Sequence, residues 1–187
     1  MREALERTVL SRRVREPDTL VVHELGLRHG KARVDVAVVN GHLHGYEIKS
    51  EMDRLDRLAR QVEAYGLVFD KATLVAAESH LDAALSVIPN WWGVRIAIRR
   101  DGHVQLRRYR SERINRDVSA LAIAELLWKE EALGALAYLG LSKAVARLSR
   151  AEVYKLLVQS ITITQLRRLV RLTLRSRVGW RDRPALA

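Results

Sequence analysis

Cysteine is absent from this chain of 187 residues, and no long uninterrupted apolar run occurs in it. Without cysteine there is no disulfide, no thiolate zinc site and no cysteine nucleophile, so the candidate metal ligands are carboxylates and six histidines. No stretch approaches the ~18 consecutive apolar residues of a membrane span, and the start MREALERTVLSRR lacks the apolar centre of a secretory signal. These absences predict a cytoplasmic protein and favour hard cations over soft metals.

Positive charge, by contrast, is abundant. Lysine and arginine number 33 against 22 acidic residues, which gives a net charge of +11 and a pI near 10.6. A hydrophobic content of 48% with 29% charged residues is typical of a soluble globular protein. The composition therefore predicts a folded domain with a polyanionic partner.

The excess charge is concentrated in two stretches that contain arginine and no lysine. Residues 95–116 hold eight arginines and two acids, and residues 167–183 hold seven arginines and one acid. Arginine's planar fork binds phosphate in a bidentate manner, although a solvated face remains the alternative. The candidate nucleic-acid contacts are Arg99, Arg100, Arg107, Arg108, Arg167, Arg168, Arg171 and Arg175.

The pattern of residues 1–116 predicts an α/β fold. A short helix over 3–10 precedes a strand over 20–27, and Asn40-Gly41 marks a hairpin between RVDVAVV and HLHGYEIKS. Apolar residues at helical spacing predict a helix from Asp53 to Tyr65, which crosses back to a parallel strand, ATLVAA. A short helix near 80–87 and a second hairpin at Asp101-Gly102 complete a central mixed sheet flanked by helices.

After residue 116 the strand signal stops. Helix is predicted up to Gly140, a good residue beyond a helix C-terminus, and Ser149 with Glu152 forms a capping box. The last helix is amphipathic, with leucine and valine on one side and arginine on the other. We expect a core over residues 1–116 and a helical basic C-terminal region over 117–187.

The segment Glu47-Ile48-Lys49 carries the chemistry. Because side chains alternate along a strand, Glu47 and Lys49 share one face. A two-residue turn at Asn40-Gly41 would put Asp35 on the wrong face, whereas a three-residue loop, Val39 to Gly41 with Gly41 left-handed, puts Asp35 diagonal to Glu47. We predict the longer loop. Two carboxylates on one face repel unless a cation lies between them, and Mg²⁺ or Mn²⁺ suits oxygen ligands.

These residues resemble the PD-(D/E)XK nuclease superfamily, of restriction-enzyme and Holliday-resolvase type, and within it a small bacterial branch. The match is Asp35 followed by Glu47-Ile48-Lys49, although Val34 stands where many members have proline. The resemblance implies a restriction-endonuclease-like αβββαβ core over roughly residues 3–77, to which the pattern after residue 116 adds a helical C-terminal extension.

The resemblance also implies roles for individual residues. Asp35, Glu47 and the backbone carbonyl of Ile48 would hold the metal, and Lys49 would lie beside the attacking water. Glu24 is the candidate for an auxiliary acid and further metal ligand, with Glu6 second. Gln61 and Tyr65, on the helix after the motif, would share one face, Gln61 orienting the site.

Other residues have mainly structural interpretations. His42 and His44 alternate onto the face opposite Glu47, where packing or exposure is favoured over metal binding. Trp91 and Trp92 are predicted to anchor a loop on the core, with base stacking as the alternative.

The sequence therefore predicts a Mg²⁺- or Mn²⁺-dependent DNA endonuclease acting in repair, recombination or a mobile-element or defence context. Duplex or branched DNA would be bound through phosphates, and a homodimer would serve cleavage of both strands. No helix-turn-helix or zinc module is evident. The first alternative is a catalytically inactive nuclease-fold module that binds nucleic acid or a partner, and the second uses the C-terminal basic helix as a membrane-surface or docking element.

Overall fold

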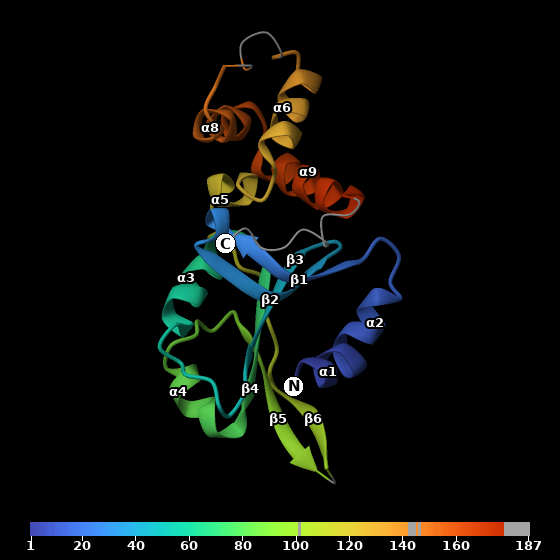
Figure 1. Cartoon of the computed structure of the whole chain (residues 1–187), viewed down its shortest axis with the longest axis vertical. Helices are drawn as coiled ribbons and strands as arrows, with labels where there is room; N and C mark the ends of the chain where they lie inside the picture. Colours follow the sequence, from blue (N-terminus) through green and yellow to red (C-terminus); the bar gives the residue numbers. More distant parts are fainter. Residues whose placement is uncertain (101, 142–144, 146, 178–187) are drawn as a thin grey trace.

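A single six-stranded sheet forms the centre of the molecule. The computed structural model describes residues 1–100, 102–141, 145 and 147–177 (Figure 1). The strand order along the sheet follows the chain, β1-β2-β3-β4-β5-β6. The strands are β1 Leu20–Leu27, β2 Ala32–Val39, β3 Leu43–Lys49, β4 Lys71–Ala77, β5 Gly93–Arg100 and β6 His103–Arg110. The β3–β4 and β4–β5 pairs are parallel and the others antiparallel, so the predicted mixed α/β sheet is confirmed.

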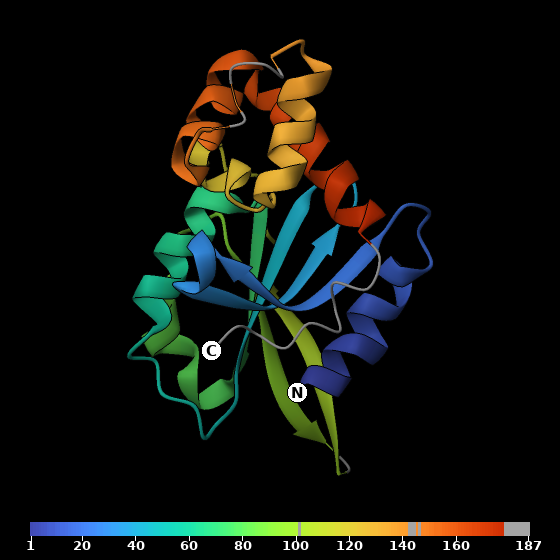
Figure 2. The ribbon, with the colours of Figure 1, turned by 45° about the horizontal axis from the view of Figure 1, so that its top comes forward.

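Helices cover both faces of the sheet. Figure 2 shows the N-terminal helical segment on one side of the sheet and α3 on the other. The N-terminal segment consists of α1 Arg2–Leu5, the π-helical turn η1 Glu6–Leu10 and α2 Ser11–Val14. The crossover helix is α3 Leu58–Val68, and the 3-10 turns η2 Arg28–Gly30 and η3 Glu78–His80 and helix α4 Leu81–Leu85 lie between strands. The C-terminal helices are α5 Ala120–Ala124, α6 Lys129–Tyr138, α8 Arg150–Ser160 and α9 Ile163–Ser176.

The C-terminal helices share the larger of the two hydrophobic cores that the described residues form. Buried Ile123, Leu136, Leu157 and Leu174 belong to the same cluster as the residues of β2 and α3 that face them. The smaller core joins Leu5 and Leu10 to the opposite sheet face. The last strand ends at Arg110 and α5 begins at Ala120, while the division into domains at residue 116 stays a prediction.

Two local predictions about the C-terminal helices agree with the structure. Gly140 adopts a left-handed φ of 82° just after α6, and the Leu141 amide donates to the Leu136 carbonyl at 3.0 Å, as in a Schellman motif. The Ser149 side chain accepts from the Glu152 amide at 3.3 Å, and the Glu152 carboxylate accepts from the Ser149 amide at 2.8 Å. Within the described part of the chain, no helix is long and apolar enough to span a bilayer.

The β2–β3 loop differs from its prediction. Val39 opposes Leu43, so the three loop residues are Asn40, Gly41 and His42, and Gly41 is not left-handed. The Asn40 side-chain oxygen accepts from the His42 amide at 3.1 Å, which shows that asparagine begins the turn. Continuing this register places Asp35 directly opposite Glu47 rather than diagonal to it. Both acids still share one face, as the longer loop predicted.

The crossover helix also begins later than its prediction, at Leu58 rather than Asp53. The Asp53 carboxylate accepts from the Ser50 amide at 2.7 Å and from the Ser50 hydroxyl at 2.5 Å. An aspartate that bonds neighbouring backbone in this way favours a turn over a helix. The residues from Asp53 to Arg57, which helical periodicity assigned to the helix, therefore precede it.

The close approach of β3 to Phe69 gives a test of the core. A Cβ added at Gly45 would lie 2.9 Å from two ring atoms of buried Phe69, whereas one added at Gly26 meets nothing within 4 Å. We expect Gly45→Ala to lower the free energy of unfolding by about 1–3 kcal/mol through overpacking. Gly26→Ala, the matched control in β1, should change it by less than about 1 kcal/mol. Urea denaturation measures both, and equal effects would contradict the packing.

Candidate functional site

A cavity of about 670 Å³ gathers all of the predicted catalytic and metal-binding residues. Its lining includes Glu24 of β1, Asp35 of β2, Glu47 and Lys49 of β3, and Gln61 of α3. Ile48 also lines it. Strand alternation puts the β2 and β3 residues on one face, and the crossover from β3 to β4 lays α3 over that face.

The carboxylate of Glu47 is the centre of a buried polar network. Glu47 Oε1 lies 2.8 Å from Lys49 Nζ and accepts from Gln61 Nε2 at 2.5 Å. Glu47 Oε2 accepts from the Tyr65 hydroxyl at 2.5 Å, and Lys49 Nζ donates to Gln61 Oε1 at 2.9 Å. Glu47 is only 1% exposed and Lys49 only 5%. The four side chains satisfy one another across the interface between β3 and α3.

The protonation of both acids is shifted by their surroundings. Burial raises the pKa of Glu47, and the charge of Asp35 raises it further, while Lys49 and Tyr65 oppose the shift. Burial also raises the pKa of Asp35, against the lowering effect of a hydrogen bond from the Ile48 amide at 2.7 Å. Burial and the adjacent Glu47 raise the pKa of Tyr65 well above its usual value. The two carboxyls are thus less ready to ionise than free side chains.

Glu24 lies beside Asp35 but is bound by arginine. Arg2 donates to its carboxylate at 2.6 Å, and Arg33 lies 3.7 Å away. Arg2 also lies 3.9 Å from the Asp35 carboxylate. Glu24 has a left-handed φ of 54°, a strained conformation for this residue type. Glu6, the second candidate, lies 3.8 Å from His23 and is not part of the cavity lining.

A divalent ion does not fit this arrangement of donors. Glu47 Oε1 is occupied by Lys49 and Gln61 and Oε2 accepts from Tyr65, so this carboxylate has little capacity left for an ion. Asp35 uses one oxygen for the Ile48 amide. Across residues 1–100, 102–141, 145 and 147–177, no group of three or more histidine or acidic side chains could hold a metal. In the folded protein, the hydrogen bonds of Glu47 and Lys49 connect β3 to α3.

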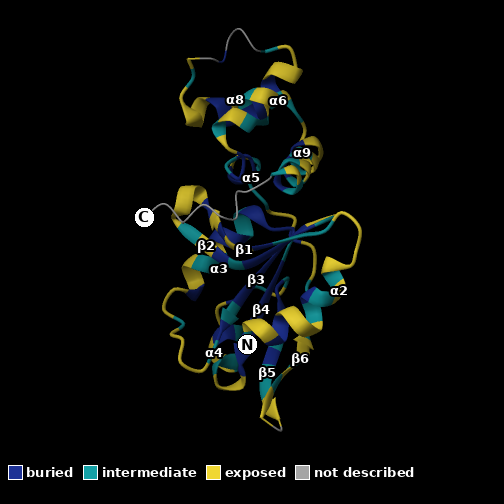
Figure 3. Ribbon diagram, turned by 45° about the vertical axis from the view of Figure 1, so that its right-hand side comes forward, coloured by how far each residue is buried: buried dark blue, intermediate teal, exposed yellow. Residues whose placement is uncertain are grey.

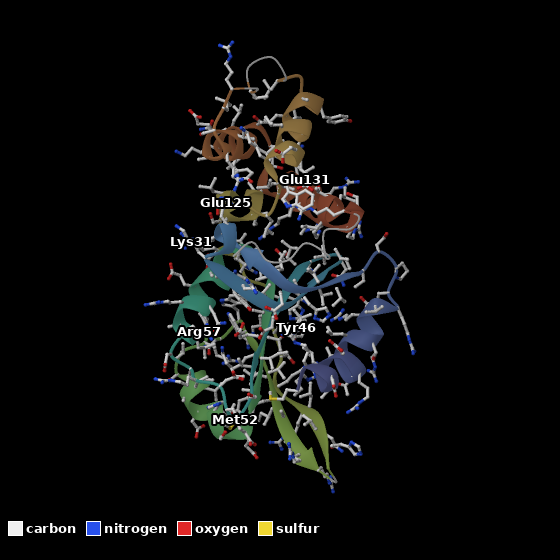
Figure 4. The ribbon with its side chains drawn as sticks, in the orientation of Figure 1. Lys31, Tyr46, Met52, Arg57, Glu125 and Glu131 are labelled. Atoms are coloured by element: carbon white, nitrogen blue, oxygen red, sulfur yellow. The ribbon has the colours of Figure 1, made fainter. Side chains whose placement is uncertain are left out.

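The rim of the cavity is basic, which the sequence analysis did not recognise. Five basic side chains join Lys49 in the lining: Arg28, Lys31, Arg33, Arg57 and Arg60. Figure 4 labels Lys31 and Arg57, which lie on the same side of the molecule. The available signal for Arg28, Lys31 and Arg33 was the basic run RHGKAR, which follows β1 and extends into β2. Five acids in the same lining offset this charge: Glu24, Asp35, Glu47, Asp53 and Glu63.

The histidine and tryptophan residues have structural contacts. His44 lies 2.9 Å from the Thr73 hydroxyl and stacks on Tyr46, and burial lowers the pKa of His44 to about 3. Trp92 is fully buried and stacks on Tyr65 with ring centroids 5.2 Å apart. The ring of Trp92 thus packs beneath the same tyrosine that donates to Glu47.

The arginines predicted to bind nucleic acid lie at two ends of the molecule. Arg99, Arg100, Arg107 and Arg108 are exposed on the β5–β6 hairpin, at the opposite end from the C-terminal helices (Figures 1 and 3). The other four lie on α9. Asp101 of the hairpin turn and Arg181 and Arg183 of the second basic stretch lie outside the described residues.

Asp70 fixes the position of α9, a role that the sequence analysis missed. Its buried carboxylate accepts from the Leu43 amide at 2.8 Å and lies 3.3 Å from Arg167 Nε. One of the eight predicted arginines therefore serves a structural contact. Leu166, Val170 and Leu174 on the apolar side of α9 are all buried. That side is therefore unavailable for a membrane surface, contrary to the alternative raised from the sequence.

The raised pKa of Asp35 gives a test of the cavity. Because the folded protein favours the neutral form, the carboxyl destabilises it as pH rises through the shifted pKa. Asp35→Asn should therefore raise the free energy of unfolding at neutral pH. This gain should fade toward about pH 3, where the carboxyl is protonated in both states.

Urea denaturation of wild type and Asp35→Asn at both pH values measures the effect. Asp56→Asn is the matched control, because the Asp56 side chain is 63% exposed and, among the described residues, forms an ion pair with Arg54 alone. Asp56→Asn should leave stability nearly unchanged at both pH values. A lower free energy of unfolding for Asp35→Asn at neutral pH would contradict this, because it would show that the ionised carboxylate stabilises the folded protein.

Comparison with known proteins identifies the family. The family model described as "Bacteriophage P4 protein cII" matches residues 2–184. A segment of 60 residues is 37% identical to "Protein cII" of Enterobacteria phage P4. The aligned segment covers 32% of this chain and 23% of that protein. The chain thus aligns with about a quarter of the length of this relative. No solved structure matches the chain.

These findings correct the functional prediction. Membership of the PD-(D/E)XK superfamily, and of a bacterial branch of it, is wrong, because the model that matches nearly the whole chain describes a different family. The metal-dependent endonuclease, with the terms nuclease, hydrolase and metal-binding, is unsupported for the same reason. The hydrogen bonds accepted by both oxygens of Glu47 agree with this correction. The chain belongs to the family of bacteriophage P4 protein cII.

Proposed function

We propose that this protein is a DNA-binding module that holds the phosphate backbone without hydrolysing it. The observation that carries the proposal is the β5–β6 hairpin, on which Arg99, Arg100, Arg107 and Arg108 are exposed. Among the described residues, no ion pair involves any of these four arginines. Unpaired guanidinium groups repel one another, and phosphate oxygens relieve that repulsion by bidentate hydrogen bonds.

The register of the hairpin distributes this charge over both of its faces. Arg107 opposes Ile96, Arg108 opposes Arg95, and Arg99 opposes Val104. Alternation therefore directs Arg99 and Arg108 to one face of the ribbon and Arg100 and Arg107 to the other. A two-stranded ribbon fits the major groove of B-DNA, which is about 12 Å wide. Arginines on both faces of such a ribbon could reach the phosphates of both strands.

The strands themselves contain no competing carboxylate. The sequences GVRIAIRR and HVQLRRYR contain six arginines and no acidic residue. One of the six, Arg110, is used inside the protein, where it donates to the Trp92 carbonyl at 2.8 Å and the Pro89 carbonyl at 3.1 Å. The hairpin is thus anchored at its base by one arginine and carries Arg99, Arg100, Arg107 and Arg108 as exposed side chains. Together with a net charge of +11, this supports a polyanionic partner.

The finer predictions about the partner belong to this proposal. Duplex DNA suits the ribbon, and branched DNA offers the same phosphates. The expected homodimer rested on cleavage of both strands, so it loses its reason together with the enzymatic interpretation. Binding of Mg²⁺ or Mn²⁺ was expected from the sequence, and we propose instead that the site binds neither ion, because both oxygens of Glu47 already accept hydrogen bonds.

Salt dependence tests the hairpin. Each lost phosphate contact reduces the slope of log K against log salt by about 0.9, so Arg107→Gln with Arg108→Gln should reduce it by roughly two. Fluorescence anisotropy with a labelled duplex, between about 50 and 200 mM salt, measures the slope. The matched control is Arg150→Gln with Lys155→Gln on α8, which removes the same charge from exposed positions. Equal slopes for the two double variants would contradict the proposal.

Metal removal tests whether DNA binding needs a metal ion, and metal addition tests whether the protein hydrolyses DNA. Phosphate contacts by arginine need no metal, so EDTA should leave DNA affinity unchanged, and DNA should stay intact after incubation with Mg²⁺ or Mn²⁺. A calorimetric titration with Mn²⁺ should give no saturable binding, because the Glu47 oxygens already accept hydrogen bonds. DNA binding that disappears in EDTA would overturn the proposed mode of binding.

A further inference from the structure

A second cavity, of about 420 Å³, lies between α9 and the β2–β3 turn. Arg168, Arg171 and Arg175 of α9, at i, i+3 and i+7, line one wall together with Leu172. Asn40 and Gly41 of the turn and Pro17 and Asp18 before β1 line the other wall. Figure 2 shows α9 beside this end of the sheet. The helical spacing of the three arginines places them along one side of the helix.

The charge of this pocket is one-sided. Three arginines line it against a single acid, Asp18, whose side chain is 81% exposed. The larger cavity near Glu47 contains six basic and five acidic side chains, so its charges nearly cancel. The smaller pocket therefore has more net positive charge for its volume than the larger cavity has. A concave site of one sign concentrates counter-ions of the opposite sign.

Two of the three arginines have no ion-pair partner in the part of the chain that the structure describes. Arg175 lies 3.8 Å from the Asp18 carboxylate and donates to the Asp18 carbonyl at 2.7 Å. The remaining two, Arg168 and Arg171, appear in none of the ion pairs between described residues. Among the described residues, no carboxylate lies within ion-pair distance of either guanidinium.

The surroundings of Arg171 add further positive charge. Burial lowers the pKa of Arg171, and the charges of Arg167 and Arg175 lower it further, against the opposing effect of Asp70. Burial lowers the pKa of His42, on the same turn, and Lys71, Arg171 and Arg167 add to that shift against Asp70. A bound anion would relieve this crowding of cations.

We infer that this pocket binds a phosphate group, with Arg168 and Arg171 as its main ligands and Arg175 held in place by Asp18. A phosphate offers several acceptor oxygens in a geometry that matches two guanidinium forks. The inference rests on the proposed function only for the source of the phosphate. DNA backbone would supply it if α9 and the hairpin bind one nucleic acid, and a free phosphate ester is the other source.

Gly41 allows a test that leaves every arginine in place. Its backbone is not left-handed, and a Cβ added there meets nothing within 4 Å. Both Gly41→Ala and Gly41→Asp should therefore fold normally. The aspartate would add a carboxylate to the lining of the pocket and compete with phosphate, whereas the alanine would not.

The experiment measures binding of inorganic pyrophosphate by calorimetry and of a DNA duplex by anisotropy, using the full chain. Pyrophosphate affinity should fall at least about tenfold in Arg168→Gln with Arg171→Gln and in Gly41→Asp. Gly41→Ala and the α8 control, Arg150→Gln with Lys155→Gln, should bind as wild type does. Thermal unfolding checks that each variant is folded.

The outcomes separate the pocket from the proposed function. A salt slope for DNA that falls by roughly two in Arg168→Gln with Arg171→Gln identifies backbone phosphate as the ligand. Loss of pyrophosphate binding with an unchanged DNA slope identifies a free phosphate ester instead. Equal pyrophosphate binding by wild type and the double arginine variant, or no binding by wild type, overturns the pocket. A wild type that binds pyrophosphate but no DNA overturns only the proposed function.

Discussion

The burial of Glu47 with Lys49 is the constraint on which the arrangement of this domain depends. Removing a carboxylate and an ammonium from water costs several kcal/mol per ion unless the remaining hydrogen-bonding groups are satisfied. Here Gln61 and Tyr65 satisfy them, and both come from α3. The network therefore fixes α3 over β3, and Tyr65 carries the constraint into the core by stacking on Trp92. Removing any one of the four would break at least one hydrogen bond of this buried network.

The same network shows how a nuclease-like motif can occur in a chain that belongs to another family. An acid, a spacer and E-x-K on neighbouring strands place two carboxylates and an ammonium together whatever the protein does with them. In this chain Glu47 uses both oxygens inside the protein, and Glu24 is bound by Arg2 and Arg33. A polar cluster of this kind can hold a fold together, so function has to be argued from the free groups rather than from the motif.

Free positive charge lies away from that network. The large cavity balances six basic side chains with five acids, whereas the hairpin strands contain arginine without acid and the α9 pocket has a single acid. The α9 pocket exists because Asp70 and the apolar side of α9 fix the helix against the sheet and the β2–β3 turn. Burial of the apolar side leaves the remaining arginines facing the turn or solvent. Structural contacts thus decide which arginines remain available to a ligand.

The sequence by itself determined the features that depend on neighbouring residues. Strand alternation put Glu47 and Lys49 on one face, Asn40-Gly41 marked a hairpin, and Gly140 ended a helix, because backbone geometry and local hydrogen bonds set each of these within a few residues. Tertiary structure decided what depends on distant partners. Pairing of β2 with β3 fixed the register opposite Glu47, and buried Asp70 selected Arg167 as its partner from a run of similar arginines. Whether Glu47 was free for chemistry depended on Gln61 and Tyr65, since only the fold brings donors fourteen and eighteen residues away to its two oxygens.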